Sequence, residues 1–277
     1  MEKVTDWLAL WETLSDLQNR SWGYAKKKHE GKDAWKDRAR HFQELVQKRW
    51  AKPDASREFI LSTLKDTPGA TVIDIGAGTG SWSVLMAPHA ARVTALEPSE
   101  AMREVLSENL AAFNISNVAI QIGEWPDVEI EPHDVVFASH SMYGCRNFKA
   151  FVQKMTKVGR KRCMLLLRAP LQNSIMADAA RHVWGQPYDS PNFQIAFNAL
   201  LQMGLFPNVC MEADLWDPWT SPSVQDALNE IKRRLCLMDD SRYDDYFLGL
   251  LKDTLSEENG QMVWPRETRS AMVYWDL

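Results

Sequence analysis

A short β-branched run that ends in closely spaced glycines is the feature that most constrains this chain. Thr71–Ile75 has the sequence Thr-Val-Ile-Asp-Ile, and Gly76, Gly78 and Gly80 follow it at once. β-Branched residues favour a strand, and glycines after a strand let the backbone take positive φ and approach a ligand closely. Ser81–Ala87 is predicted to be the next helix. A strand, a glycine turn and a helix in this order predict a nucleotide-binding site in an α/β fold.

Strands and helices alternate after this loop. The further predicted strands are Arg92–Leu96, Val118–Ile122, Asp134–Ser139, Arg162–Arg168, Asn208–Asp214 and Arg269–Asp276. The predicted helices are Ala34–Trp50, Ala55–Leu64, Ser99–Phe113, Phe148–Val158 and Asn192–Met203. Such alternation is typical of a parallel, doubly wound sheet with helices on both faces.

The chain is expected to form a single domain over residues 1–277, with two segments outside the sheet. Residues 1–65 are predicted to be a helical cap, and residues 66–215 to be the nucleotide-binding core. Residues 216–262 are predicted to be a helical insertion that covers the substrate. Residues 263–277 are predicted to hold the last strand.

Two carboxylates narrow the choice of ligand. Asp74 lies inside the strand end, two residues before Gly76. A buried acid there repels a pyrophosphate but suits a ligand with ammonium and sulfonium groups. Glu97 ends the second strand, where an acid can accept hydrogen bonds from both ribose hydroxyls. The Gly76-x-Gly78-x-Gly80 spacing also differs from the G-x-G-x-x-G of dinucleotide sites, which disfavours the alternative of a nicotinamide-dependent oxidoreductase.

Longer segments carry a resemblance to a known family. The run VIDIGAGTG, followed by VTALEPS, resembles motif I and the next acidic strand end of class I S-adenosylmethionine-dependent methyltransferases. The segment QIGEWPDVEIEPHDVVFASHSMY resembles the later motifs of that superfamily. The resemblance covers about residues 55–170 well. It implies a Rossmann-like α/β sheet of seven strands with an antiparallel last strand, and S-adenosyl-L-methionine as the cofactor.

The resemblance also implies roles for individual residues. The implied cofactor-binding residues are Asp74, Gly76, Ala77, Gly78, Gly80, Glu97, Pro98, Glu124, Trp125 and Ser139. The glycine loop would line the methionine part of the cofactor, Glu97 would hold the ribose, and Glu124 and Trp125 would hold the adenine. Ser139 and His140 would face the sulfonium and the methyl acceptor.

His140 is the first candidate for a catalytic base, because its side chain titrates near neutral pH, and Tyr143 is the second. A packing role for His140, Tyr143 or Trp125 stays open. The six histidines are scattered without paired ligand spacing, so no metal is expected.

Composition bears on the partners. The formal net charge of −5 disfavours a nucleic-acid substrate. The four cysteines form no CxxC pair and are expected to be reduced thiols. No apolar run reaches the ~20 residues that span a bilayer, and no targeting segment is recognisable. A cytoplasmic protein without a membrane partner is therefore expected, and a homodimer stays open.

These features together predict a methyltransferase that acts on a small or medium-sized molecule by in-line transfer. Large aromatic residues outside the sheet are expected to form a lid over the carboxyl edge of the strands, with packing on the sheet as the alternative. They are Trp22, Tyr24, Trp35, Phe42, Trp216, Trp219, Tyr243, Tyr246 and Phe247. The run Lys26–Lys28 is expected to be solvated.

Two other functions stay open. One is a cofactor-binding regulatory or assembly protein without transferase activity. The other is an RNA or protein methyltransferase, which the acidic charge disfavours where RNA is concerned. Ser139-His140-Ser141-Met142 stands where base-amine and glutamine methyltransferases carry Asn-Pro-Pro-Tyr, which weakens that alternative further.

Overall fold

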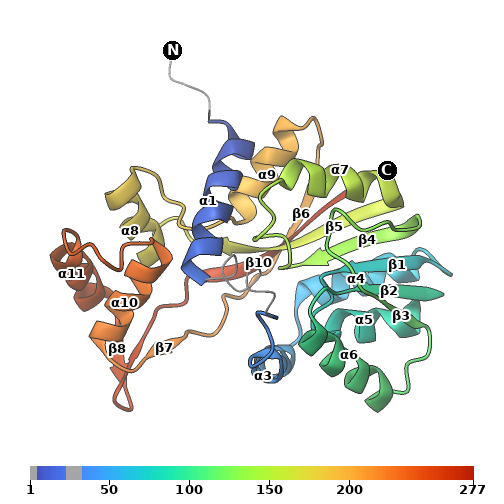
Figure 1. Cartoon of the computed structure of the whole chain (residues 1–277), viewed down its shortest axis with the longest axis horizontal. Coiled ribbons are helices and arrows are strands. Elements are labelled where there is room, and N and C mark those ends of the chain that lie inside the picture. Colours follow the sequence, from blue (N-terminus) through green and yellow to red (C-terminus); the bar gives the residue numbers. More distant parts are fainter. Residues whose placement is uncertain (1–4, 23–32) are drawn as a thin grey trace.

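A seven-stranded sheet forms the centre of the molecule in the computed structural model, which describes residues 5–22 and 33–277 (Figure 1). The strand order is β3-β2-β1-β4-β5-β10-β6. The bounds are β1 Thr71–Ile75, β2 Arg92–Leu96, β3 Val118–Gln121, β4 His133–Ser139, β5 Gly159–Pro170, β6 Asn208–Met211 and β10 Thr268–Asp276. Strands β1 to β5 pair in parallel, whereas β10 is antiparallel to β5 and β6. The predicted fold is confirmed.

Helices cover both faces of this sheet (Figure 1). One face carries α1 Trp7–Trp22, α7 Phe148–Val158 and α9 Phe193–Gln202; the other carries α4 Ala55–Lys65, α5 Ser81–Met86, the 3-10 turn Ala87–His89 and α6 Glu100–Ala112. Alternate side chains of each strand pack against one helix layer or the other, because successive residues of a strand point to opposite faces. Ile73 and Ile75 belong to the apolar core shared with α7 and α9, while Val72 belongs to the core shared with α4.

A second lobe lies beyond the edge where β5 ends and β10 begins (Figure 1). It contains α8 Ile175–Trp184, α10 Val224–Arg234 and α11 Asp244–Thr254. It also contains a small antiparallel sheet of β7 Thr220–Ser221, β9 Gln261–Val263 and β8 Ser256–Glu258. These helices share one apolar core around Ile231 and Phe247.

The structure corrects three details of the prediction. The insertion 216–262 was expected to be helical, but three short strands frame its two helices. Strands of two or three residues are too short for an alternating pattern to reveal them. Helix α8 was not predicted, and although it lies within residues 66–215 it packs with the insertion rather than with the sheet. The predicted strand Asn208–Asp214 also ends earlier, at Met211.

The remaining helix of the cap, α3 Ala39–Trp50, packs against α6 and approaches the glycine loop. Tyr24 and Lys26–Lys28 lie outside the described residues, and so does the side chain of Trp22. Within residues 5–22 and 33–277, no group of three or more His, Cys, Asp and Glu side chains could hold a metal ion. In the same ranges, no helix combines the length and the apolar character needed to cross a bilayer.

Candidate active site

The site lies where the parallel strands β1, β2, β4 and β5 end, since parallel strands bring their carboxyl ends to one edge. The glycine loop joins β1 to α5 at this edge. Gly76, Gly78 and Gly80 all have positive φ, at 68°, 56° and 83°. A Cβ on Gly76 would lie 2.4 Å from the Cβ of Ser141, which follows β4. The loop therefore needs glycine both for its backbone angles and for its close contact with the neighbouring strand end.

Asp74 is buried beneath this loop, at 1% exposure. Its Oδ2 accepts a hydrogen bond from Ser83 Oγ at 2.7 Å. Its Oδ1 is also buried and has no hydrogen-bond partner among the described residues. Burial, assisted by the nearby Glu97 carboxylate, raises the pKa of Asp74 to about 7. A buried acceptor without a donor is costly, so this oxygen suits a ligand that brings a donor, best of all a cationic one.

Glu97 ends β2 and is held rigidly by the backbone. Its Oε2 accepts from the N–H of Gly78 at 2.8 Å, and its Oε1 accepts from the N–H of Ser99 at 2.9 Å. Ser99 in turn caps α6 by accepting from the N–H of Met102 at 3.1 Å. Burial raises the pKa of Glu97 as well. Each carboxylate oxygen keeps a second lone pair, so the group can still accept hydrogen bonds from a diol. Pro98, next to it, is exposed.

Trp125 and Glu124, which are predicted to hold an adenine ring, differ in their burial. Trp125 is buried, its indole N–H donates to the carbonyl of Phe151 at 3.1 Å, and its ring packs edge-on against that residue of α7. The ammonium group of Lys154 lies 5.2 Å from the centre of the Trp125 ring. Glu124 is exposed beside it. Trp125 thus has a clear packing role, and its contact with a cofactor stays a prediction.

His140 and Tyr143 lie together after β4, as the sequence suggested. His140 Nδ1 is 2.9 Å from the Tyr143 hydroxyl, which accepts a hydrogen bond from the N–H of Arg168 at 2.6 Å. Ser139, just before them, is the half-buried last residue of β4. Burial lowers the pKa of His140 to about 3, assisted by the charges of Arg49 and Arg168. His140 is therefore neutral near pH 7 and a weak base there. Burial raises the pKa of Tyr143.

Two arginines that the sequence patterns do not predict lie beside this pair. The Arg168 guanidinium lies 4.2 Å from the centre of the Tyr143 ring, and that of Arg49 lies 4.0 Å from the centre of the Trp216 ring. Trp216 contacts His140 edge-on, with ring centres 5.6 Å apart. Arg168 could have been noticed as a charged residue at the end of an apolar strand. Nothing in the sequence links Arg49, near the end of α3, to the same place.

The cap covers part of the site. Phe42 of α3 lies 3.8 Å from where a Cβ of Gly78 would be, and it packs against Trp35. Asp33 accepts hydrogen bonds from Ser99 Oγ and from the N–H of Ala101, at 2.8 and 3.1 Å, which ties the cap to the start of α6.

The other aromatic residues expected in a lid are divided. Trp216 reaches the site, and Trp219 lines a small cavity beside Arg168. Tyr243 and Phe247 instead pack in the core of the second lobe, and Tyr246 stacks on His182.

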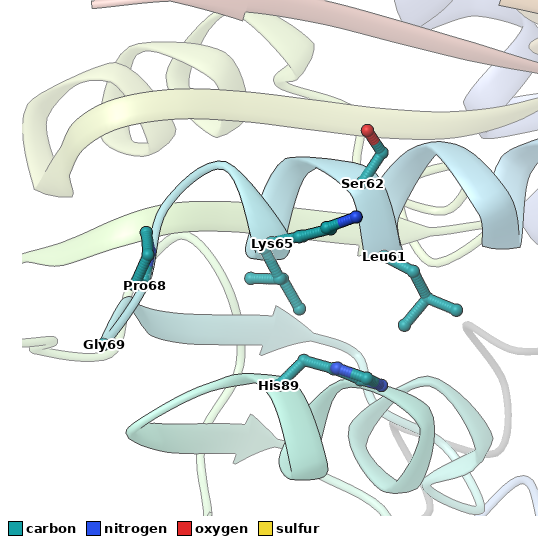
Figure 2. A pocket seen from close by; sticks show the side chains of 7 residues that line it. Leu61, Ser62, Lys65, Pro68, Gly69 and His89 are labelled. Carbon is teal, nitrogen blue, oxygen red and sulfur yellow. The ribbon is translucent and has the colours of Figure 1, made fainter.

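A wider hollow lies elsewhere. Figure 2 shows it between α4 and the 3-10 turn, with Leu61, Lys65, Pro68 and His89 on its walls. Its volume is about 460 Å³. Pro68 and Gly69 precede β1, so this hollow lies at the amino end of that strand, opposite the glycine loop. It includes no residue of the predicted site.

Comparisons with known proteins find methyltransferases. Residues 72–162 match a family model described as "Methyltransferase domain". Over 72 residues the chain is 39% identical to the ribosomal protein L11 methyltransferase of Acetivibrio thermocellus, covering 26% of this chain and 23% of that protein. Over 90 residues it is 37% identical to the cobalt-precorrin-6B C(15)-methyltransferase (decarboxylating) of Salmonella typhimurium, covering 32% and 47%. The matched part is thus less than half of each of these relatives.

Among solved structures, the YcgJ protein of Bacillus subtilis shares the fold, with a TM-score of 0.53 at 15% identity over 79% of this chain and 96% of that one. The family match runs from β1 to the start of β5, so it includes the glycine loop and the carboxyl ends of β1, β2 and β4. Residues 72–162 are therefore similar in sequence to a methyltransferase domain, and the chain shares the fold of a solved protein at low identity.

Proposed function

We propose that this protein transfers a methyl group from S-adenosylmethionine to a small or medium-sized molecule. One observation carries the proposal: a loop whose glycines have positive φ lies between two buried carboxylates, and Asp74 Oδ1 has no donor among the described residues. The cofactor of this superfamily has an α-amino group and a ribose diol, the donors that such a pair of acids would bind.

Each part of the cofactor has a proposed partner in the chain. Asp74 and the loop Gly76–Gly80 would hold the methionine part, and ionisation of Asp74 would be restored by the ammonium group beside it. Glu97 would accept from the ribose hydroxyls, with Pro98 beside it. Glu124 and Trp125 would approach the adenine, and Ser139 would line the edge nearest the sulfonium.

The protein's own residues would mainly orient the reactants and exclude water. The cofactor supplies an already activated methyl group, so no metal or covalent intermediate is required of the chain. In-line transfer depends on alignment and desolvation. Helix α3 and Trp216 would provide that desolvation from two sides. His140 would orient the acceptor as a neutral hydrogen-bonding group rather than remove a proton from it.

The enclosure of the site supports a small acceptor. The cap contributes Phe42 and the insertion contributes Trp216, both at the carboxyl edge. One relative acts on a ribosomal protein, but the match to it covers only 72 residues. The cysteines Cys145, Cys163, Cys210 and Cys236 are free thiols, which fits the cytoplasm as the proposed compartment.

Isothermal titration with S-adenosylmethionine and S-adenosylhomocysteine tests the cofactor site. We expect both to bind, and Asp74→Asn to weaken S-adenosylmethionine at least about tenfold, because a charge-assisted hydrogen bond is lost. Asp253→Asn, an exposed carboxylate on α11, is the matched control and should leave the affinity unchanged.

The outcomes separate the candidate functions. Absence of binding, or equal affinity in wild type and Asp74→Asn, would contradict the proposal. Binding without formation of S-adenosylhomocysteine, across a broad set of small acceptors, would instead favour a regulatory protein.

A further inference from the structure

Two arginine side chains lie near the His140–Tyr143 pair, and neither forms an ion pair with an acid among residues 5–22 and 33–277. Arg168 comes from the end of β5 and Arg49 from the end of α3. They flank the His140–Tyr143 pair: Arg168 lies over the Tyr143 ring, and Arg49 lies over Trp216, which contacts His140. Both guanidinium charges act on His140. Residues far apart in the chain thus place two guanidinium groups around one histidine.

The acidic residues near Arg49 are engaged with other cations. Asp54 forms an ion pair with Arg57 at 2.7 Å. Asp217 forms ion pairs with Lys52 at 2.9 Å and Arg266 at 3.1 Å. Arg49 is exposed as a residue, yet desolvation around its guanidinium lowers its pKa. Among the described residues, no carboxylate lies within ion-pair distance of that guanidinium.

In the part of the chain that the structure describes, the acceptors of the Arg168 guanidinium are likewise neutral. One of its terminal nitrogens donates to Gln18 Oε1 at 3.0 Å and to the carbonyl of Pro191 at 3.3 Å. The acids that share a small cavity with it are already bonded. Asp189 pairs with Arg234, and Glu267 accepts from the N–H of Ile175 at 2.9 Å.

Neither guanidinium group has a carboxylate within ion-pair distance among the described residues, so both keep donors that an anion could accept. Guanidinium groups bind carboxylates and phosphates in bidentate geometry. The cluster also adjoins the cofactor region, since Ser141, one residue after His140, donates to the carbonyl of Ile75 at 2.7 Å beside the glycine loop.

We propose that Arg49 and Arg168 bind an oxyanion group, a carboxylate or a phosphate, of the methyl acceptor. This inference rests on the proposed methyltransferase function, because it names the acceptor's chemistry. The two guanidinium groups draw electron density from the bound oxyanion. The oxyanion is therefore the recognition group, and another atom of the same molecule receives the methyl group.

Binding of simple probes tests this without knowledge of the natural acceptor. The protein is saturated with S-adenosylhomocysteine and titrated with benzoate, phenyl phosphate and uncharged benzamide. We expect the anions to bind and benzamide to bind far more weakly, and the two anions show whether carboxylate or phosphate is preferred. Arg49→Gln and Arg168→Gln should each weaken the preferred anion about tenfold or more, as expected when a charge-assisted bidentate contact is lost.

Two further variants separate binding from folding. Arg168→Lys keeps the charge and should retain part of the affinity. Arg242→Gln removes an exposed arginine of the second lobe that pairs with Asp240, and it should change nothing. All variants should keep the wild-type affinity for S-adenosylhomocysteine. Equal binding of anions and benzamide, or wild-type anion affinity in both glutamine variants, would overturn the inference.

A failure of this inference can be distinguished from a failure of the proposed methyltransferase function. If S-adenosylhomocysteine does not bind, the methyltransferase proposal fails, while the same titrations without it still report whether the arginine pair binds oxyanions. With labelled S-adenosylmethionine, a metabolite extract separated on an anion exchanger gives a second measurement. Methyl transfer to the retained fraction supports the inference, and transfer only to the unretained fraction contradicts it.

Discussion

Replacing Gly76 by alanine tests the close packing of the glycine loop against β4. Gly76 has φ of 68°, and an added Cβ would lie 2.4 Å from the Cβ of Ser141. A Cβ cannot rotate away as a longer side chain can, because the backbone fixes it. We expect about 1–2 kcal/mol from left-handed backbone strain and about 1–3 kcal/mol from overpacking.

The loss in free energy of unfolding is therefore expected to be about 2–5 kcal/mol, which lowers Tm by about 4–20 °C in a domain of this size. Gly185→Ala is the matched control, since Gly185 has φ of 71° but nothing within 4 Å of its Cβ position. It should cost only the strain of about 1–2 kcal/mol. Urea denaturation of both variants, followed by circular dichroism, gives the difference directly.

A double-mutant cycle isolates the clash. Ser141→Gly removes the opposing Cβ and by itself should cost about 0.5–1.5 kcal/mol, for the lost hydrogen bond to the carbonyl of Ile75. In the double variant with Gly76→Ala, the part of the stability loss that comes from overpacking should disappear. The coupling energy of the cycle is therefore expected to be about 1–3 kcal/mol. Equal losses for Gly76→Ala and Gly185→Ala, or additive losses in the cycle, would refute the reasoning.

Three further predictions concern the carboxylates and Trp125. The folded pKa of Asp74, about 7, exceeds its ordinary value of 3.8, so the folded protein binds a proton that the unfolded chain releases between these pH values. The free energy of unfolding without cofactor should therefore fall as pH rises from 3.8 to 7. Denaturation at several pH values should show a smaller dependence of this free energy on pH for Asp74→Asn. An unchanged dependence would contradict the raised pKa. Glu97→Gln should lower the affinity for S-adenosylhomocysteine about tenfold in calorimetry, because the NH₂ group of the glutamine cannot accept a hydrogen bond from the ribose or the backbone. Wild-type affinity in this variant would exclude Glu97 from the site. Trp125→Phe should lose about 1 kcal/mol of stability with the bond to Phe151 and keep most cofactor affinity, whereas a large loss of affinity at unchanged stability would show that the ring mainly contacts the adenine.

The sequence by itself determined the sheet and the position of the glycine loop. Both depend on short-range patterns: β-branched runs that end in glycine, apolar helical spacing between them, and an acid at the strand end. The strand order confirmed the predicted fold, and the positive φ of the loop glycines confirmed their predicted turn. The burial of Asp74 also follows locally, because it lies inside a central strand.

Only the tertiary structure decided what surrounds that loop. Arg49 precedes β1 and Arg168 lies near the end of β5, so the two are far apart in the sequence. No local pattern predicts that both charges act on His140. Trp125 resembled an adenine contact by its position in the sequence, but its indole N–H is directed to α7. The low pKa of His140 arises from burial and from cations on other elements. Local sequence sets the secondary structure and the backbone of the loop, whereas burial and the electrostatic field of a site are sums over residues that come together only when the chain folds.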